Sequence, residues 1–439
     1  MRYGRFSHLW SIYHQLAGDV GPVHLGLSKY NSPLVRTGPH YLVTTDPNVW
    51  RHVNGARSIY QRDAWWAAGR IDYQRPSLAD ALDSTSHNKM KAKVAGGYSR
   101  RDVDLERIID GQIAKFADVM RRKHVGWNKV DFADISRFFT LDVITRLAYG
   151  KGVRQIQAEA DSQAWVGRVV GLGREEIKRR FAEDKQDDRD MIGSFMRHGL
   201  TVNEIEDEAL IQIFASSDTT AIVLRSVILH LIATPRVCVH RRTTNYGRLR
   251  AYTILTCPPL LPDSRLKTDI KNAVSSGKVS TPIALAQAQS LPYLQAVIWE
   301  GFRMRPAVTY GHYKVVPPGG DTIAGIWVPG GTAIGHSHFG MMRNEGIFGK
   351  DVDVFRPERY LDEPNGDEMQ RTVELVFGTG RWMCVGKQVA LMELNKIFWE
   401  LFRQFDFQLA HPDKAGWKET STVTFTHREM WIKITEAEK

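Results

Sequence analysis

The feature that most constrains the fold is a helical pattern over about residues 202–234. Thr201 and Glu204 form a capping box at its beginning, and Pro235 marks its far end. At about 1.5 Å per residue, a helix of this length spans roughly 50 Å. Because the segment is apolar on several faces, protein must cover it along most of its length. The sequence therefore predicts a long helix that runs through the middle of a domain.

The rest of the chain combines helical patterns with short strand-like runs. Helical periodicity dominates residues 100–150, recurs at 173–183, and returns in a last amphipathic helix that begins near Cys384 and reaches about Leu401. Strand patterns occupy residues 34–37 and 41–44, several short runs between 323 and 338, and residues 405–409 and 421–425. Gly38-Pro39 predicts a hairpin between the first two runs. The combination predicts a mainly α fold with small β-sheets.

Net charge and cysteine content narrow the function classes. The excess of 59 Lys and Arg over 49 Asp and Glu gives a formal charge of +10, which suits nucleic acid, anionic lipid or an acidic protein. Basic stripes interleaved with aromatics and zinc-ligand spacings are absent, so nucleic-acid binding is not predicted. Three cysteines exclude a disulfide framework and indicate a reducing compartment. No segment approaches the ~18–20 uncharged apolar residues of a membrane span, which predicts a soluble or peripheral chain.

The most informative segment is the run from Phe377 to Gly386, FGTGRWMCVG. Its three glycines permit a tight loop whose backbone can approach a flat ligand closely. Cys384 lies at the entry to a helix, where free N–H groups and the helix dipole favour a thiolate. Arg381 adds a positive charge that suits a carboxylate. These features favour a thiolate ligand beneath a planar, acid-bearing cofactor such as heme, while a buried structural cysteine is the alternative.

This segment resembles the FxxGxRxCxG heme-binding loop of cytochromes P450, with Arg381 one position before the motif's arginine and Trp382 in the place of that arginine. Residues 300–303 resemble the ExxR helix motif of that family, residues 355–359 resemble its PERF-like segment, and the order and spacing agree. The resemblance implies a single domain over residues 1–439 with the cytochrome P450 fold. It also implies heme b (iron protoporphyrin IX) as cofactor. The residues that it assigns are Cys384 as axial ligand of the heme iron, Phe377, Gly378 and Arg381 as cofactor-binding residues, and Glu300, Arg303 and Arg359 as a buried structural ion network.

Residues 215–220, ASSDTT, resemble the oxygen-activation motif (A/G)Gx(D/E)T of the same family. The resemblance implies that Asp218 and Thr219 are catalytic and deliver protons to iron-bound oxygen. The alternative is local, because Ser and Thr hydroxyls in helices commonly bond to carbonyls of their own helix. Ser216 also stands where the family usually has glycine.

A further resemblance concerns the heme propionates. His87 and Lys91, four residues apart on a predicted helix, resemble the WxxxR-type pair that holds a propionate, and Lys314 is a third candidate. A solvated helix face is the alternative for the first two.

Several segments resemble the narrower group of fungal enzymes similar to pisatin demethylase, among them residues 189–192, 291–297 and 316–322. The resemblance implies a location on the cytosolic face of the endoplasmic reticulum membrane. No anchor helix is predicted in the sequence as written, which by itself predicts a cytoplasmic or peripheral protein. Residues 150–174 are shorter than the two helices that roof the substrate cavity in the family. Residues 240–267 match nothing in it, and are either a genuine insertion or a gene-model error such as a translated intron.

The resemblance implies a heme-thiolate monooxygenase that inserts one atom of O2 into a small apolar molecule, in fungal secondary-metabolite biosynthesis or detoxification. Electrons of NADPH would come from a separate NADPH–cytochrome P450 reductase. The positive charge suits docking to an acidic reductase and peripheral contact with an anionic membrane. The alternative is a catalytically impaired or inactive heme-binding relative with a defective substrate roof.

Overall fold

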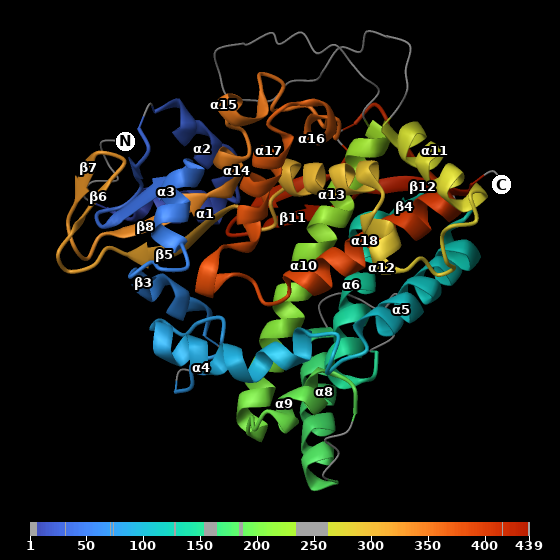
Figure 1. Cartoon of the computed structure of the whole chain (residues 1–439), viewed down its shortest axis with the longest axis horizontal. Helices are drawn as coiled ribbons and strands as arrows, with labels where there is room; N and C mark the ends of the chain where they lie inside the picture. The colour runs from blue at the N-terminus through green and yellow to red at the C-terminus, as the bar shows by residue number, and fades with distance from the viewer. Residues whose placement is uncertain are drawn as a thin grey trace.

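The computed structural model describes residues 7–30, 32–70, 72, 74–126, 129–152, 165–183, 188–233, 262–414 and 416–437. Its central element is the helix α10 (Val202–Ala233), which crosses the middle of the molecule (Figure 1). Thr201 N donates to Glu204 Oε2 at 2.8 Å and Glu204 N donates to Thr201 Oγ1 at 3.3 Å, which confirms the predicted capping box. Pro235 and most of the unmatched segment, residues 240–261, lie outside the described residues.

The helices that surround α10 carry most of the core. Those in contact with it are α6 (Phe132–Tyr149), α8 (Trp165–Ala182), α9 (Met191–Arg197), α11 (Pro262–Ser275), α13 (Pro292–Met304) and α18 (Lys387–Gln404). Every residue from Ala221 to Ile228 is buried, because the middle of α10 is covered on all sides. A Cβ atom on Gly301 of α13 would lie 2.3 Å from Val227 Cγ2, so the glycine lets the two helices approach closely.

Shorter helices fill the periphery. The other α-helices are α1 (Leu9–Ala17), α2 (Val20–Leu25), α3 (Pro47–Asn54), α4 (Ser84–Val94), α5 (Leu105–Val119), α12 (Leu285–Gln289), α14 (His338–Met341), α15 (Glu345–Phe348), α16 (Arg359–Asp362) and α17 (Gly366–Val373). The 3₁₀ turns are η2 (Gly26–Lys29), η3 (Ala64–Gly69), η4 (Ala95–Tyr98), η6 (Glu374–Phe377) and η7 (Gly380–Trp382), and η5 (Met120–His124) is a π-helical turn.

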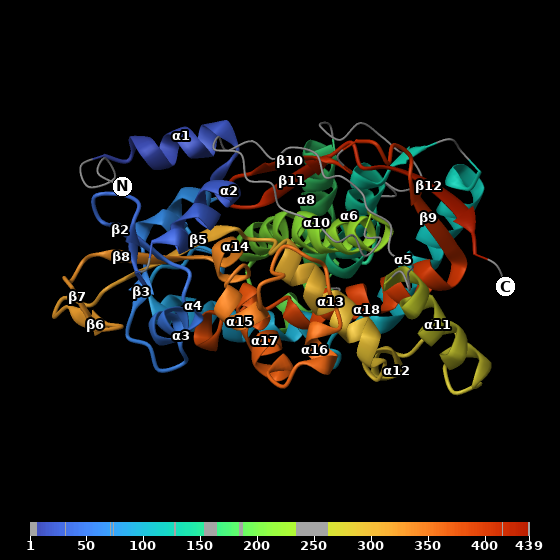
Figure 2. The ribbon, with the colours of Figure 1, turned by 90° about the horizontal axis from the view of Figure 1, so that it is seen from above.

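The strands form small sheets. The largest described sheet has the order β1 (Val35–Arg36), β2 (Tyr41–Thr44), β8 (Ala333–Ser337), β5 (Tyr310–Val315), β3 (Gln61–Arg62), with β2 and β8 parallel. A second sheet has the order β4 (Val130–Asp131), β12 (Trp431–Glu436), β9 (Phe405–Leu409), and two pairs are β6 (Asp321–Ile323) with β7 (Ile326–Val328), and β10 (Lys418–Ser421) with β11 (Phe425–Arg428). The large sheet lies at the N-terminal side of the molecule, and β11 passes over α10 (Figure 2).

The mainly α fold with small sheets is confirmed, and two local expectations need correction. Residues 421–425 do not form one strand, because Ser421 ends β10, Phe425 begins β11 and pairs with it, and residues 422–424 reverse the chain between them. The last helix begins at Lys387, so Cys384 lies in the loop before it.

Candidate heme site

Backbone hydrogen bonds and two glycines shape the loop that carries Cys384. Cys384 N donates to Phe377 O at 2.7 Å, which closes the loop. Gly378 and Gly380 have φ of +70° and +62°, a conformation that side chains rarely adopt. A Cβ atom on Gly380 would lie 2.7 Å from the backbone of Ala56, so only glycine lets the loop pack against that segment. The spacing of the motif therefore follows from a close approach of two chain segments.

The Cys384 side chain is exposed in the described chain. Surrounding protein atoms desolvate the thiol and raise its pKa, while the backbone N–H groups of Gly386 and Lys387 and the charge of Lys91 act in the opposite direction. The backbone amides predicted to favour a thiolate are therefore in place, but in the protein alone they lower the pKa of the thiol by less than desolvation raises it. A metal ion bound to the sulfur would deprotonate it outright.

A pair of buried cations lies beside this loop. Arg62 of β3 stands opposite Lys314 of β5 in the sheet. Both reach the ring of Trp382 in η7, with Arg62 Cζ at 4.5 Å and Lys314 Nζ at 3.6 Å from the ring centroid. Like charges directly opposite each other on neighbouring strands are destabilising. The arrangement therefore calls for an anion between them.

Among the described residues no carboxylate pairs with either side chain, although the charge of Asp80 acts on Arg62. Lys314 Nζ and Arg62 Nε are buried without a hydrogen-bond partner among the described residues. Burial, followed by the charges of Arg62 and Arg381, lowers the pKa of Lys314 to about 5, and burial lowers that of Arg62 to about 9. Unpaired buried donors of this kind are costly unless a ligand satisfies them. The residues present thus fit a cofactor that carries carboxylates next to Cys384, as heme does.

The other predicted propionate residues lie in the same region with different contacts. Lys91 Nζ donates to the carbonyls of Arg381 and Met383 at 2.8 and 3.0 Å, so it holds the cysteine loop. The His87 ring lies 4.2 Å from that of Trp382, and burial together with Arg62 lowers the pKa of His87 to about 4. Its ring is therefore neutral near pH 7. Arg381 makes one long bond, from Nη2 to Ala56 O at 3.4 Å, and remains available to a ligand.

The structure brings Glu300, Arg303 and Arg359 together in a fully buried network. Arg303 donates to both carboxylate oxygens of Glu300 at 2.8 Å, and Arg359 Nε donates to Glu300 Oε1 at 3.1 Å. The backbone N–H of Arg356 and the hydroxyl of Tyr360 also donate to this carboxylate, at 2.8 and 3.1 Å. Although burial acts to raise it, the two arginines lower the pKa of Glu300 to about 2.

Asp218 and Thr219 lie on α10, and both are at least partly accessible. Thr219 Oγ1 donates to Ala215 O at 2.7 Å, the bond to its own helix that was the local alternative. Phe214 and Ala215 on the same part of α10 are also exposed. The helix therefore presents an open face around the predicted acid and alcohol.

Sequence reasoning missed Arg62 and Trp382. Arg62 belongs to a two-residue strand without a motif, and only its register opposite Lys314 reveals its role. Trp382 stands at the position that the cysteine loop motif gives to arginine. A large aromatic residue there, next to Arg381, is the one signal that could have predicted a stacking surface for cations.

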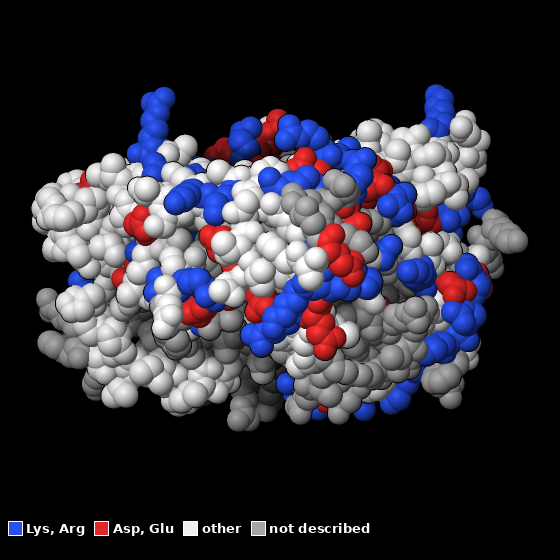
Figure 3. All heavy atoms as spheres, turned by 90° about the horizontal axis from the view of Figure 1, so that it is seen from below, with Lys and Arg blue, Asp and Glu red and all other residues white. Residues whose placement is uncertain are grey.

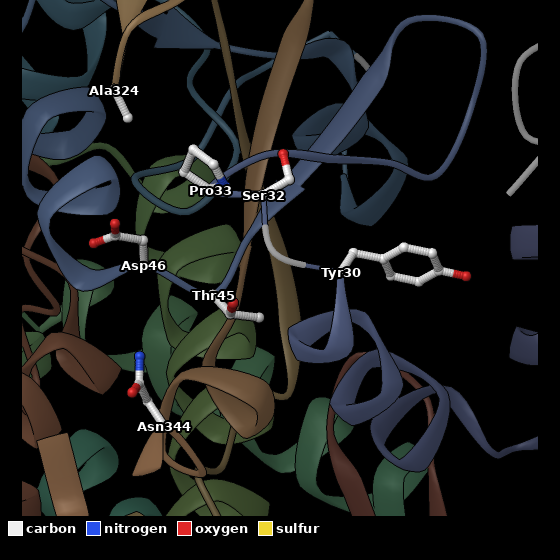
Figure 4. A pocket seen from close by; sticks show the side chains of 7 residues that line it. All are labelled: Tyr30, Ser32, Pro33, Thr45, Asp46, Ala324 and Asn344. Carbon is white, nitrogen blue, oxygen red and sulfur yellow. The ribbon is translucent and has the colours of Figure 1, made fainter. Parts of the chain in front are cut away.

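A separate surface pocket of about 400 Å³ lies between the segment before α3 and the turn of the β6–β7 hairpin. Figure 4 shows its seven lining side chains, of which Asp46 carries the only carboxylate. Asp46 Oδ1 accepts a hydrogen bond from Asn48 N at 2.7 Å and caps α3. Its carboxylate thus has a local structural role, and none of the predicted site residues lines this pocket.

Comparison with known proteins decides the family. The family model described as "Cytochrome P450" matches residues 263–431. The cytochrome P450 monooxygenase ABA1 of Pyricularia oryzae is 36% identical over 99% of this chain and 91% of its own length. The chain belongs to the cytochrome P450 family. This P450 is also similar to aba1 of Botryotinia fuckeliana, at 35% identity over 99% of the chain and 90% of the relative. Pisatin demethylase of Fusarium vanettenii is 26% identical over 94% of the chain and 84% of the relative.

Family membership confirms the resemblance and the enzyme class. This P450 is a monooxygenase with a heme-iron cofactor, and enzymes of this class use O2 and electrons from a redox partner. The geometry agrees, since Cys384 is accessible and the buried side chains of Arg62 and Lys314 both contact the ring of Trp382, two residues before the cysteine.

Proposed function

We propose that this P450 inserts one atom of O2 into a small apolar molecule of fungal secondary metabolism or detoxification. The observation that carries the proposal is the pairing of an accessible thiol at Cys384 with two buried cations that lack an anion. Heme b, whose two carboxylates match the two cations in charge, is the proposed form of the cofactor. The names of its relatives support the monooxygenase class.

Each residue of the site has a separate task in this proposal. Cys384 binds the iron through its thiolate, and Arg62 and Lys314, with Arg381 and His87 beside them, bind the carboxylates. Lys91 fixes the loop by its bonds to two loop carbonyls. Phe377 packs edge-on against Phe302, with ring centroids 5.1 Å apart, and thereby ties the loop to α13. When bound, the cofactor supplies the chemistry of oxygen activation.

Asp218 and Thr219 are proposed to move protons. Asp218 is exposed on α10 and can exchange its proton with water. Rotation about the Thr219 Cα–Cβ bond releases its hydroxyl from Ala215 O and lets it donate toward the open face of the helix. When no other acceptor is present, the hydroxyl stays bonded to Ala215 O.

The electrons are proposed to come from NADPH–cytochrome P450 reductase at the cytosolic face of the endoplasmic reticulum membrane. The formal charge of +10 supports docking to an acidic partner, although Lys and Arg are interspersed with Asp and Glu on the face in Figure 3. The exposed Leu9 and Leu16 of α1 support contact with a membrane surface. Within the described residues, α10 alone has the length and composition of a membrane span, and 67% of its most apolar window is buried inside the protein.

Reconstitution with purified reductase tests the proposal. The heme-loaded protein, NADPH and oxygen-18 gas are incubated with a panel of small aliphatic and aromatic hydrocarbons and ethers, and products are analysed by mass spectrometry. We expect a product with one labelled oxygen atom, and none from Cys384→Ala. Reduction of the iron by the reductase without any labelled product would favour the impaired relative instead.

A further inference from the structure

The loop of residues 77–82, between η3 and α4, is bound by two arginines, Arg62 at its backbone carbonyls and Arg70, whose Nε lies 3.5 Å from Asp80 Oδ1. Arg62 Nη1 donates to the carbonyls of Leu78, Ala79 and Ala81 at 3.0, 2.9 and 3.0 Å. The backbone N–H of Arg62 also donates to Leu82 O at 3.1 Å. Arg62 thus binds four backbone carbonyls of this segment, which we call the 77–82 loop.

The opposite side of the 77–82 loop is held by α10. Leu78 N donates to Glu208 Oε1 at 2.6 Å, and Glu208 is buried. By helical spacing, Glu208 lies on the same face of α10 as Ala215 and Thr219, which are seven and eleven residues further on. The loop therefore covers the first part of the α10 face that carries the proposed proton-transfer residue.

Arg62 also faces the cofactor site. Its guanidinium lies 3.9 Å from the Trp66 ring centroid and 4.5 Å from that of Trp382. Trp66 is itself held, because its Nε1 donates to Tyr313 O at 3.1 Å and its ring stacks on His312 at 4.6 Å. The plane of the guanidinium is thus fixed while its Nε, buried and without a partner, is left free for a ligand.

We propose that Arg62 is a positioning residue that couples occupancy of the heme-carboxylate site to the order of the 77–82 loop over α10. The proposal rests on the heme site proposed above. A carboxylate at Arg62 Nε relieves the repulsion from Lys314 and fixes the position of the guanidinium, so that Nη1 stays directed at the loop carbonyls. Lysine cannot replace it, because one ammonium cannot bind three carbonyls and a carboxylate in this planar arrangement.

Hydrogen exchange read by mass spectrometry tests the coupling. Heme-loaded and heme-depleted forms are compared for the wild type, Arg62→Lys and the control Arg122→Lys, an exposed arginine paired with Asp118. In the wild type and the control we expect heme to slow exchange in the 77–82 loop about tenfold. In Arg62→Lys the loop should exchange at the fast rate in both forms, while Lys314 and Arg381 still retain the cofactor. Absorbance gives the heme content of every sample.

The outcomes distinguish a failure of this coupling from a failure of the proposed heme site on which it rests. A wild type that takes up no heme overturns the heme site itself. A wild type and Arg62→Lys that bind heme and protect the loop equally overturn the coupling alone. If Arg62→Lys does not fold, Glu208→Met tests the same loop from α10, because it removes the acceptor for Leu78 N. That variant should bind heme and lose loop protection, and retained protection would contradict the proposal.

Discussion

At the scale of single residues, Lys314 depends most on a partner from outside the chain. Its ammonium is buried against Trp382, opposite Arg62, and without an acceptor in the described residues. Removal of this amine should have opposite effects on the two forms of the protein. The heme-free form loses a buried amine without an acceptor, whose pKa is lowered to about 5, whereas the heme-bound form loses a charge-assisted bond.

We therefore expect Lys314→Met to raise the melting temperature of the heme-depleted protein and to weaken heme binding about tenfold or more. Thermal unfolding and hemin titration measure the two effects. The control Lys433→Met changes an exposed lysine on β12 and should alter neither. Stabilisation of both forms by Lys314→Met would contradict a carboxylate at this position.

Glu300 provides a second prediction at this scale. Glu300→Gln leaves Arg303 and Arg359 buried without their carboxylate and should lower the free energy of unfolding by about 3–5 kcal/mol. The exposed pair of Arg121 with Glu436 serves as control, since Glu436→Gln should cost about 1 kcal/mol or less. Urea unfolding of the heme-loaded proteins measures both. Similar losses of stability in the two variants would contradict a structural role of the buried network of Glu300, Arg303 and Arg359.

The sequence reveals residues of this kind only where a motif fixes their spacing. Cys384, Glu300 and Arg303 were predictable because each belongs to a short local pattern. Arg62 was not, because its function arises from the register of β3 against β5, which joins residues some 250 positions apart in the chain. The bonds of Lys91 to the cysteine loop were hidden for the same reason.

At the scale of elements, the contact of α10 with α13 depends on Gly301. A Cβ atom there would lie 2.3 Å from Val227 Cγ2. Gly301→Ala should therefore lower stability by about 1–3 kcal/mol, although alanine favours a helix by about 1 kcal/mol over glycine. Val227→Ala removes the colliding methyl groups, so the double variant should be more stable than the sum of the single changes predicts. Strictly additive losses in urea unfolding would contradict the close packing of the two helices.

The buried carboxyl of Glu208 makes α10 sensitive to pH. Burial raises its pKa to about 7 from the ordinary value of 4.5, although the bond from Leu78 N acts in the opposite direction. The folded state then binds this proton more tightly than the unfolded state. Its destabilising effect is absent below about pH 4.5, grows as the pH rises, and is complete above about pH 7.

We expect the wild type to lose about 3 kcal/mol of stability relative to Glu208→Gln between pH 5 and pH 8. Urea unfolding of both heme-loaded proteins at the two pH values measures this difference. A constant difference across the range would contradict the raised pKa.

Long elements were predictable and short ones less so. The capping box and the apolar periodicity of α10 are strong local signals, and the helix agrees with them to within one residue. The strand predicted over residues 421–425 was wrong because Thr422, Val423 and Thr424 are residue types with high strand propensity, even where they form a turn. The turn follows from the antiparallel pairing of β10 with β11, and residue propensities do not predict which strands pair.

At the scale of the whole molecule, the proposed site joins distant parts of the chain. Arg62, His87 and Lys91 come from the first hundred residues, while Lys314, Trp382 and Cys384 come from the last hundred and thirty. The large sheet joins the two parts through the pairs β2–β8 and β3–β5 (Figure 1). The assembled cluster of cations could not be derived from spacing. The shortened roof at residues 150–174 stays a prediction, because residues 153–164 lie outside the described chain.

The absorbance spectrum of the reduced, carbon-monoxide-bound protein tests the central claim most directly. It is recorded for the purified wild type, for Cys384→Ala and for Met383→Ala, which changes the exposed neighbour of the cysteine. We predict the Soret band of a thiolate-ligated heme for the wild type and Met383→Ala, and its absence for Cys384→Ala. Failure of the wild type to take up heme, or a thiolate band that persists in Cys384→Ala, would contradict Cys384 as the iron ligand.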